Sequence, residues 1–107
     1  MLVLLDENLP HRLRLLIPGH DVRTVDFQGW KSLNNGALLK AAEDAGFDVM
    51  ITADQGIQYQ QNMKSRKIAI VILSSNEREI VAAHGPEIVA AIASAKRGGF
   101  VRVDIGS

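Results

Sequence analysis

Five apolar runs of strand length, separated by helix-like stretches, limit the fold of this chain more than any other feature. The runs cover residues 2–5, 20–25, 48–52, 68–73 and 100–105. Strands that alternate with helices are typical of a parallel sheet, and nearly continuous apolar strands are typical of a sheet covered on both faces. We therefore predict an α/β fold, a three-layer α/β/α sandwich with a mostly parallel five-stranded sheet. The alternating pattern of the last run predicts a strand at the edge of that sheet.

The stretches between the apolar runs predict the helices and their ends. Helical patterns cover residues 7–16, 35–45, 54–65 and 76–97. Asn8 and Asn35 are suited to cap the first and second of these helices, and Pro10 suits a first turn. Gly46 fits the position just past the end of the second helix. Pro86 predicts a break in the last helix, because proline has no backbone N–H to donate.

The composition is that of an ordinary globular protein and excludes several classes. The 107 residues suit one domain, 1–107, and the 47% hydrophobic and 22% charged residues suit a folded core. Without cysteine, the chain forms neither a disulfide nor a thiolate metal site. The apolar runs are too short for a signal peptide or a membrane span, so we expect a soluble, cytoplasmic protein. The formal net charge of zero argues against nucleic-acid binding by broad electrostatic attraction.

Acidic residues stand just past two of the apolar runs. Asp6 follows the first run and Asp54 follows the third, while Asn76 comes after the fourth. In an open α/β sheet, ligands bind beyond the carboxyl ends of the strands, so these side chains are expected at one edge. Clustered carboxylates repel one another unless a cation lies between them, and oxygen ligands suit Mg²⁺ or Mn²⁺. Such an ion would activate water for attack on a phosphodiester.

Simpler explanations compete for several polar residues. Asp, Asn and Ser are common after strands because they cap the next helix, and Asn8 and Asn35 are most simply explained in that way. Glu43 and Asp44 lie on the outward face of the second helix and are expected to be solvated. The two aspartates that follow strands favour function instead, because both end core strands at the predicted ligand-binding edge.

Three motifs occur in order along the chain: VLLDENLP at the N-terminus, VMITADQG in the middle and AIVILSSN after it, with a helix that opens at Asn35. Together they resemble the small PIN-like proteins related to VapC-type toxins, over essentially the whole chain. The resemblance implies a PIN-like fold with an acidic Mg²⁺ or Mn²⁺ site that cuts single-stranded or structured RNA. It also implies a toxin that a cognate antitoxin blocks, and that often forms dimers. By position, Asp6 and Asp54 match the family's acids, and Thr52 matches the threonine that helps to orient the second acid.

The chain departs from this family pattern at two positions. Relatives usually carry an acid where this chain has Asn35 or Asn34, and another where it has Gly56. An amide oxygen can ligate a metal but supplies no charge, so Asp6 and Asp54 would hold one ion weakly, and a two-metal mechanism is not favoured. Three further carboxylates would compensate if they reached the site: Glu7, Asp26 or Glu43.

Three functions remain open from the sequence. The first is a metal-dependent endoribonuclease of the toxin type with an antitoxin partner, and the second is a weakened PIN-like domain that binds RNA or a partner protein without cutting. The third is a receiver-like phosphoacceptor domain, although residues 100–107 lack the lysine that such a domain needs. The alanine-rich segment 79–93 predicts a homodimer. The predicted site consists of Asp6 and Asp54 as catalytic metal ligands, supported by Glu7, Asn8, Asn35, Thr52 and Asn76.

Overall fold

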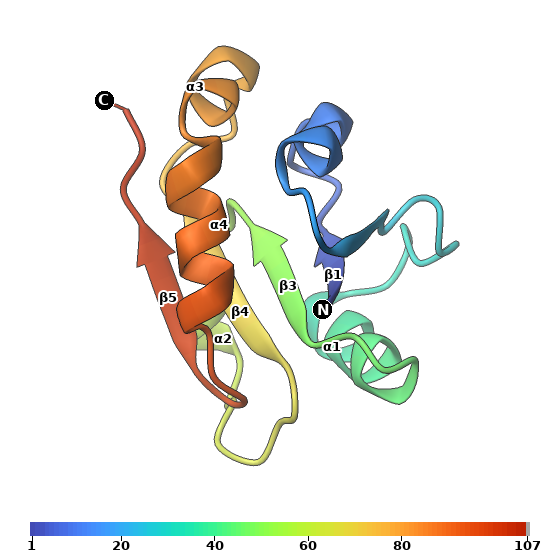
Figure 1. The fold of residues 1–107 in the computed structure, drawn as a ribbon. Coiled ribbons are helices and arrows are strands. Elements are labelled where there is room, and N and C mark those ends of the chain that lie inside the picture. Colours follow the sequence, from blue (N-terminus) through green and yellow to red (C-terminus); the bar gives the residue numbers. More distant parts are fainter. Residues whose placement is uncertain (107) are drawn as a thin grey trace.

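The sheet contains five strands that all run in the same direction. The computed structural model describes residues 1–106. Its strands are β1 (Leu2–Leu5), β2 (Asp21–Thr24), β3 (Val49–Thr52), β4 (Ala69–Leu73) and β5 (Phe100–Val103). They pair in the order β2-β1-β3-β4-β5, and every pair is parallel (Figure 1). The predicted α/β fold with a five-stranded sheet is confirmed, and the sheet is wholly rather than mostly parallel.

Burial distinguishes the central strands from the two edge strands. β3 and β4 are buried at every residue, and β1 is buried at all but its first. β2 and β5 lie at the edges of the sheet and are partly exposed. The sequence pattern follows from this arrangement, because only a strand covered on both faces needs a continuous apolar run. The predicted edge position of the last strand is confirmed.

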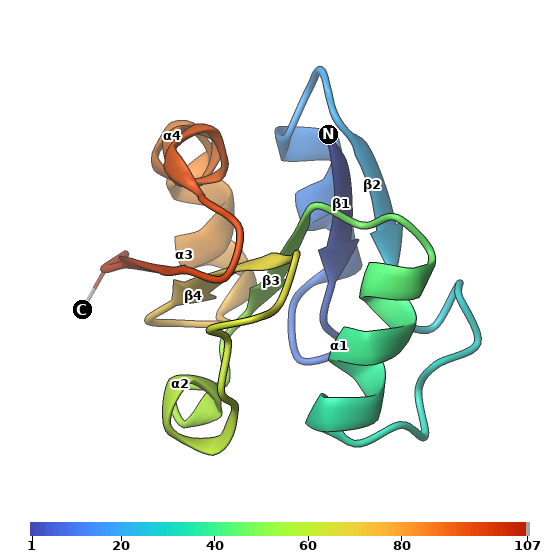
Figure 2. The same ribbon diagram turned by 90° about the horizontal axis from the view of Figure 1, so that it is seen from below.

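Helices cover both faces of the sheet (Figure 2). One face carries η1 (His11–Leu16), α3 (Arg78–Ala83) and α4 (Gly85–Ser94), and the other carries α1 (Asn35–Asp44) and α2 (Ile57–Gln60). Successive side chains of a strand point to opposite faces. In β1, for example, Val3 and Leu5 enter the apolar cluster of the first face, whereas Leu4 enters that of the second. The side chains of β1 are therefore packed on both faces of the sheet, and this packing holds the end of the strand in place.

The first two helices begin differently from the prediction. η1 is a short 3₁₀ helix that starts after Pro10, and Asn8 does not cap it. A cap at Asn8 would use the N–H groups two and three residues on, and Pro10 has no N–H. Asn34 rather than Asn35 caps α1, since Asn34 Oδ1 accepts the Ala37 N–H at 2.9 Å.

The end of α1 and the break in the last helix follow the prediction, whereas α2 is shorter than predicted. α1 ends at Asp44, and Gly46 turns the chain after it with a φ of 87°, a conformation that favours glycine. The polar stretch 54–65 forms only the single turn of α2. His84 separates α3 from α4, one residue before the predicted break at 85–86. Among residues 1–106, no helix has both the length and the apolar composition that crossing a membrane requires.

Candidate functional site

The order of the strands changes direction between β1 and β3. The chain passes from β1 outward to β2, and then returns to β3 on the other side of β1 (Figure 1). In open α/β sheets, ligands bind beyond the carboxyl ends of the strands at such a switch point. Asp6 directly follows β1, and Thr52 is the last residue of β3. The side chains predicted from the strand ends therefore lie where this fold places its ligands.

Asp6 and Thr52 are buried and hydrogen-bonded to each other. The Thr52 hydroxyl donates to Asp6 Oδ2 at 2.7 Å, and the Glu7 N–H donates to Asp6 Oδ1 at 2.9 Å. Thr52 is fully buried, and Asp6 is only 8% exposed. Each carboxylate oxygen has more than one lone pair. Asp6 is thus held in one orientation and still has the capacity to ligate a cation.

Asp54 is tied to the same threonine through its backbone. The Asp54 N–H donates to Thr52 Oγ1 at 3.0 Å. The Asp54 carboxylate accepts the Gly56 N–H on Oδ1 at 3.0 Å, and it accepts Asn35 Nδ2 on Oδ2 at 3.1 Å. One hydroxyl group therefore links the two aspartates, which follow adjacent parallel strands.

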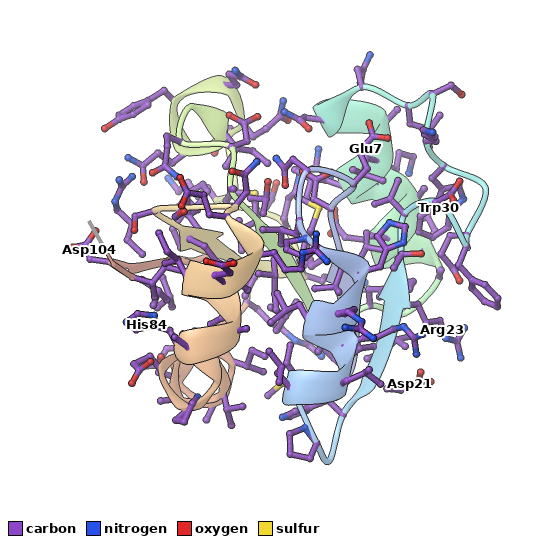
Figure 3. All side chains as sticks on the ribbon, turned by 90° about the horizontal axis from the view of Figure 1, so that it is seen from above. Glu7, Asp21, Arg23, Trp30, His84 and Asp104 are labelled. Carbon is purple, nitrogen blue, oxygen red and sulfur yellow. The ribbon has the colours of Figure 1, made fainter. Side chains whose placement is uncertain are left out.

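The four other supporting residues divide into two groups. Asn8 and Asn35 contact the site, since Asn8 Nδ2 lies 3.4 Å from Thr52 Oγ1 and Asn35 holds the second aspartate. Glu7 is exposed and lies on the α1 side of the molecule (Figure 3). Asn76 is exposed beyond β4. Within residues 1–106, no hydrogen bond joins the Glu7 or Asn76 side chain to either aspartate.

The two aspartates supply the negative charge of the candidate site. No three His, Cys, Asp or Glu side chains of residues 1–106 gather closely enough to share a metal ion. Mg²⁺ nevertheless binds through one or two protein carboxylates and takes its other ligands from water and phosphate. Asp6 and Asp54 are two carboxylates that follow adjacent strands at this edge of the sheet. Asn8 and Asn35 add hydrogen bonds around them but no negative charge.

Two polar contacts around this site were not predicted from the sequence. Asn35 Nδ2 also donates to Gln60 Oε1 at 3.1 Å, which joins α1 to α2. Gln55 donates to the Leu73 carbonyl and accepts a hydrogen bond from Arg102 Nη2 at 3.0 Å, so a guanidinium lies beside the loop that carries Asp54. The only signal for either contact was a series of glutamines after the ITAD motif. Glutamine in a polar stretch more often indicates plain surface.

A groove opens beside Asn35, between the start of α1 and the end of α2. Its volume is about 530 Å³. Its lining residues are Leu33, Asn34, Asn35, Gly36, Gln60 and Gln61, and we refer to it as the amide groove. None of these side chains carries a charge. The amide groove adjoins the candidate site because Asn35 belongs to both.

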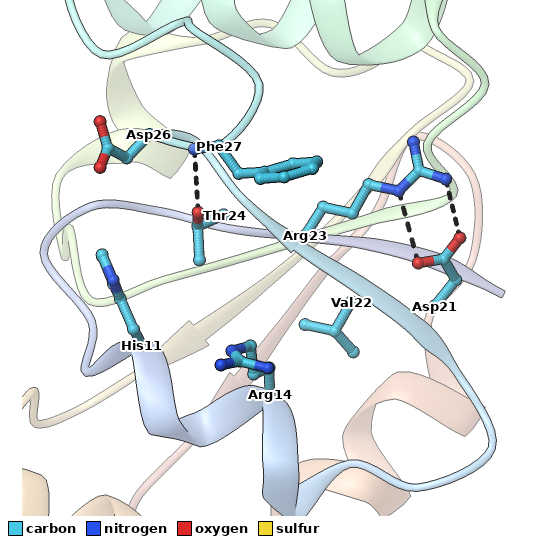
Figure 4. A pocket seen from close by; sticks show the side chains of 8 residues that line it. All are labelled: His11, Arg14, Asp21, Val22, Arg23, Thr24, Asp26 and Phe27. Carbon is cyan, nitrogen blue, oxygen red and sulfur yellow. Dashed lines mark hydrogen bonds and ion pairs between the residues drawn. The ribbon is translucent and has the colours of Figure 1, made fainter.

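A larger hollow of about 620 Å³ lies at the β2 edge, between η1 and β2 (Figure 4). Arg23 there pairs with Asp21 at 2.9 Å. The exposed Asp26 also lines this hollow. Neither Asp6 nor Asp54 does, so the larger hollow is separate from the candidate site.

Glu43 is not the solvated surface residue that the sequence predicted. Its side chain is only 15% exposed, and it accepts hydrogen bonds from Arg66 Nη1 and, at 2.8 Å, from the Lys67 N–H. Burial raises the pKa of Glu43, but the Lys67 hydrogen bond and then the Arg66 guanidinium outweigh it and lower the pKa below 4.5. Glu43 thus fastens the loop before β4 to α1.

Replacing Glu43 with glutamine is expected to lower the free energy of unfolding by roughly 1–2 kcal/mol at pH 7, because charged hydrogen bonds are lost. A lowered folded-state pKa stabilises the fold above the unfolded value, and this contribution is lost as the pH falls through the folded value. The variant should therefore lose less stability than the wild type on acidification below pH 4.5. Urea titrations at several pH values measure this. The control is Asp44→Asn, which breaks an exposed pair with Lys40 and should change little.

No family model, no curated protein and no solved structure matches this chain.

Proposed function

We propose that this protein is a metal-dependent endoribonuclease of the PIN-like toxin type, in which Asp6 and Asp54 share one Mg²⁺ or Mn²⁺ ion. One observation carries the proposal. The two aspartates come from distant parts of the chain, follow adjacent parallel strands at the switch point of the sheet, and are linked through the hydroxyl of Thr52. The resemblance of the LLDENLP and ITAD motifs to PIN-like proteins supports the same chemistry.

The residues of the site have separate roles in this proposal. Asp6 and Asp54 would hold the ion, and the charge of the ion would offset their repulsion of the RNA phosphate. Thr52 orients both aspartates, and Asn35 restrains Asp54 by donating to its second oxygen. When bound, the divalent ion supplies a water of lowered pKa and neutralises charge on the phosphodiester. Arg102, which Gln55 holds beside the Asp54 loop, is a cation within the same region of the surface.

A second candidate function is RNA or protein binding without cleavage, and a specific observation favours it. All four carboxylate oxygens of Asp6 and Asp54 already accept a hydrogen bond from the protein. The site is therefore satisfied without an ion, and Asn35 and Gly56 supply no charge to compete for one. Cleavage assays with acidic variants, described in the Discussion, separate the two functions.

The receiver-like alternative shares the strand order of this sheet, since flavodoxin-like domains also use the order 2-1-3-4-5. It needs a lysine beyond the last strand, and residues 100–107 contain none. We expect no phosphorylation of Asp54 after incubation with acetyl phosphate and Mg²⁺. Intact-mass measurement checks this, and an added phosphoryl group on the wild type that Asp54→Asn lacks would contradict it.

The biological setting of the proposal comes from the family resemblance. It comprises a cytoplasmic toxin, RNA as substrate, a cognate antitoxin and a homodimer. Several alanines of α3 and α4 are exposed and suit close packing against a second copy: Ala82, Ala83, Ala90 and Ala93. Expression of the chain alone is expected to slow growth, and Asp6→Ala should relieve that effect.

The direct test uses purified protein and end-labelled single-stranded RNA. We expect cleavage with Mn²⁺ or Mg²⁺, no cleavage in EDTA, and none by Asp6→Ala purified in the same way. That variant controls for contaminating ribonucleases. Wild-type protein that cuts no RNA with either metal, or no more than the variant does, would contradict the enzymatic proposal.

A further inference from the structure

We propose that the amide groove binds a nucleobase of single-stranded RNA, next to the site formed by Asp6 and Asp54. The inference rests on the proposed function, because it assigns a substrate-reading role to the surface beside that site. Its test measures binding without metal, so its outcome does not depend on whether the protein cuts RNA.

The chemistry of the lining favours a base over the other parts of an RNA chain. The groove contains amide side chains, a glycine and one leucine, and no charged group. A phosphate would need cations, and a metal ion would need carboxylates. Base edges present neutral donors and acceptors side by side, which the carboxamides of Asn and Gln match with one donor and one acceptor each.

The amides of the groove have hydrogen-bonding capacity to spare. Asn34 uses Oδ1 to cap α1, and Gln60 uses Oε1 to accept from Asn35, so the NH₂ group of each is left over. Within residues 1–106, no hydrogen bond engages the Gln61 side chain, which is partly buried. Asn34 and Gln60 are exposed, so these amide groups are accessible to a ligand and can donate to it.

The shape of the groove leaves room for a flat ligand. Gly36 has no side chain, and a Cβ there would lie 3.6 Å from Asn34 Oδ1 and 3.7 Å from Gln61 Oε1. Glycine thus keeps open the space between the two amides. Leu33, 38% exposed, supplies an apolar wall against which a base can stack.

The groove and the acidic site are joined through one side chain. Asn35 Nδ2 donates both to Asp54 Oδ2 and to Gln60 Oε1, each at 3.1 Å. A base in the groove therefore belongs to a nucleotide that adjoins the phosphate at Asp54. The formal net charge of zero gives the protein no broad electrostatic attraction to RNA. Contact with this base would instead give it a preference for certain sequences.

The test is fluorescence anisotropy in EDTA with labelled oligonucleotides of single-stranded adenosine, cytidine or uridine. We expect the wild type to prefer one of the three by about tenfold, the discrimination typical of one amide–base contact. Gln61→Ala removes an amide, and Gly36→Val fills the space, so each should reduce the preference to about twofold or less. Gln58→Ala removes a glutamine of α2 that does not line the groove, and it should keep the wild-type preference.

Two results would overturn the inference: equal binding of the three oligonucleotides by the wild type, or an unchanged preference in both groove variants. Circular dichroism confirms that each variant is folded. If the preference depends on Gln61 but no RNA is cut with Mn²⁺, the inference stands and the enzymatic proposal fails. If RNA is cut and the groove variants keep the wild-type base preference, the enzymatic proposal stands and the inference fails.

Discussion

The double variant Asn35→Asp, Gly56→Asp is expected to cut RNA at least about 100-fold faster than the wild type in Mn²⁺. It restores acids at the two positions where the chain departs from the PIN-like pattern. The added carboxylates would hold the divalent ion more tightly, and a cation at the reacting phosphate is typically worth this factor or more. The expected gain follows from a site with four carboxylates instead of two.

The structure accommodates both substitutions. Asn35 Nδ2 lies 3.1 Å from Asp54 Oδ2, so a carboxylate at position 35 would face Asp54 directly. Gly56 has a φ of −89°, which any residue adopts, and a Cβ there would lie 3.3 Å from Gln60 Nε2 and 3.5 Å from Asp54 Oδ1. The closer contact is with the end of a flexible side chain, which can move. Neither change therefore requires the backbone to shift.

The same variant should make stability depend on metal. In EDTA the added carboxylates repel Asp54 and should destabilise the fold by about 1–3 kcal/mol, whereas Mn²⁺ should reverse that loss. Thermal unfolding with and without Mn²⁺ measures the effect. Gln58→Asp with Asn62→Asp changes the net charge equally, at positions that form no hydrogen bond with the Asp54 side chain, and is the matched control. If neither cleavage nor metal-dependent stability increases in the double variant, the edge of the sheet is not a weakened metal site.

Replacing Thr52 with valine is expected to destabilise the fold by about 2–3 kcal/mol, a fall in Tm of roughly 10–15 °C. Threonine and valine have nearly the same shape, so the loss of stability comes from removing the hydroxyl. Asp6 Oδ2 would lose its 2.7 Å donor while remaining buried, and the Asp54 N–H would lose its acceptor. Buried polar groups left without partners are costly.

Thr52→Ser keeps the hydroxyl and loses a methyl group, so it should cost less, about 1 kcal/mol. Urea unfolding of both variants separates the hydroxyl from the packing. The cleavage assay adds a second comparison, because Thr52→Val should lose activity and Thr52→Ser should keep most of it. A valine variant as stable as the wild type would mean that Thr52 does not organise the two aspartates.

The fold could be predicted from the sequence because its pattern repeats. Each central strand is a continuous apolar run, and an apolar cluster packs against each of its two faces. The run alone predicts that both faces are covered, even though it does not say which helices cover them. The ends of the strands then follow from the runs. Asp6 and Asp54 could be assigned to one edge of the sheet on this basis alone, because parallel strands end together.

The details of the helix starts could not be predicted in the same way. Two asparagines in succession, Asn34 and Asn35, are equally suited to cap a helix, and only the path of the preceding loop decides between them. Because Asn34 caps α1, Asn35 is free to bond Asp54 and Gln60. A shift of one residue thus separates a capping role from a place in the candidate site.

Contacts between polar residues that are distant in sequence could not be predicted either. Glu43 has the sequence context of a solvated helix face, yet it is partly buried under the loop that supplies Arg66 and Lys67. The amide groove also depends on α2 being a single turn, which ends at Gln60 and brings the next residues back toward α1. Local patterns do not specify how long a short polar helix persists, because tertiary packing decides it.

Manganese binding tests the central claim most directly, since that claim is that Asp6 and Asp54 share one divalent ion. Titration with Mn²⁺, followed by electron paramagnetic resonance, gives the number of bound ions and their affinity. We expect one ion per chain for the wild type, and a loss of affinity of about tenfold or more in Asp6→Asn and in Asp54→Asn alike. No binding by the wild type, or binding that either substitution leaves unchanged, would contradict the account.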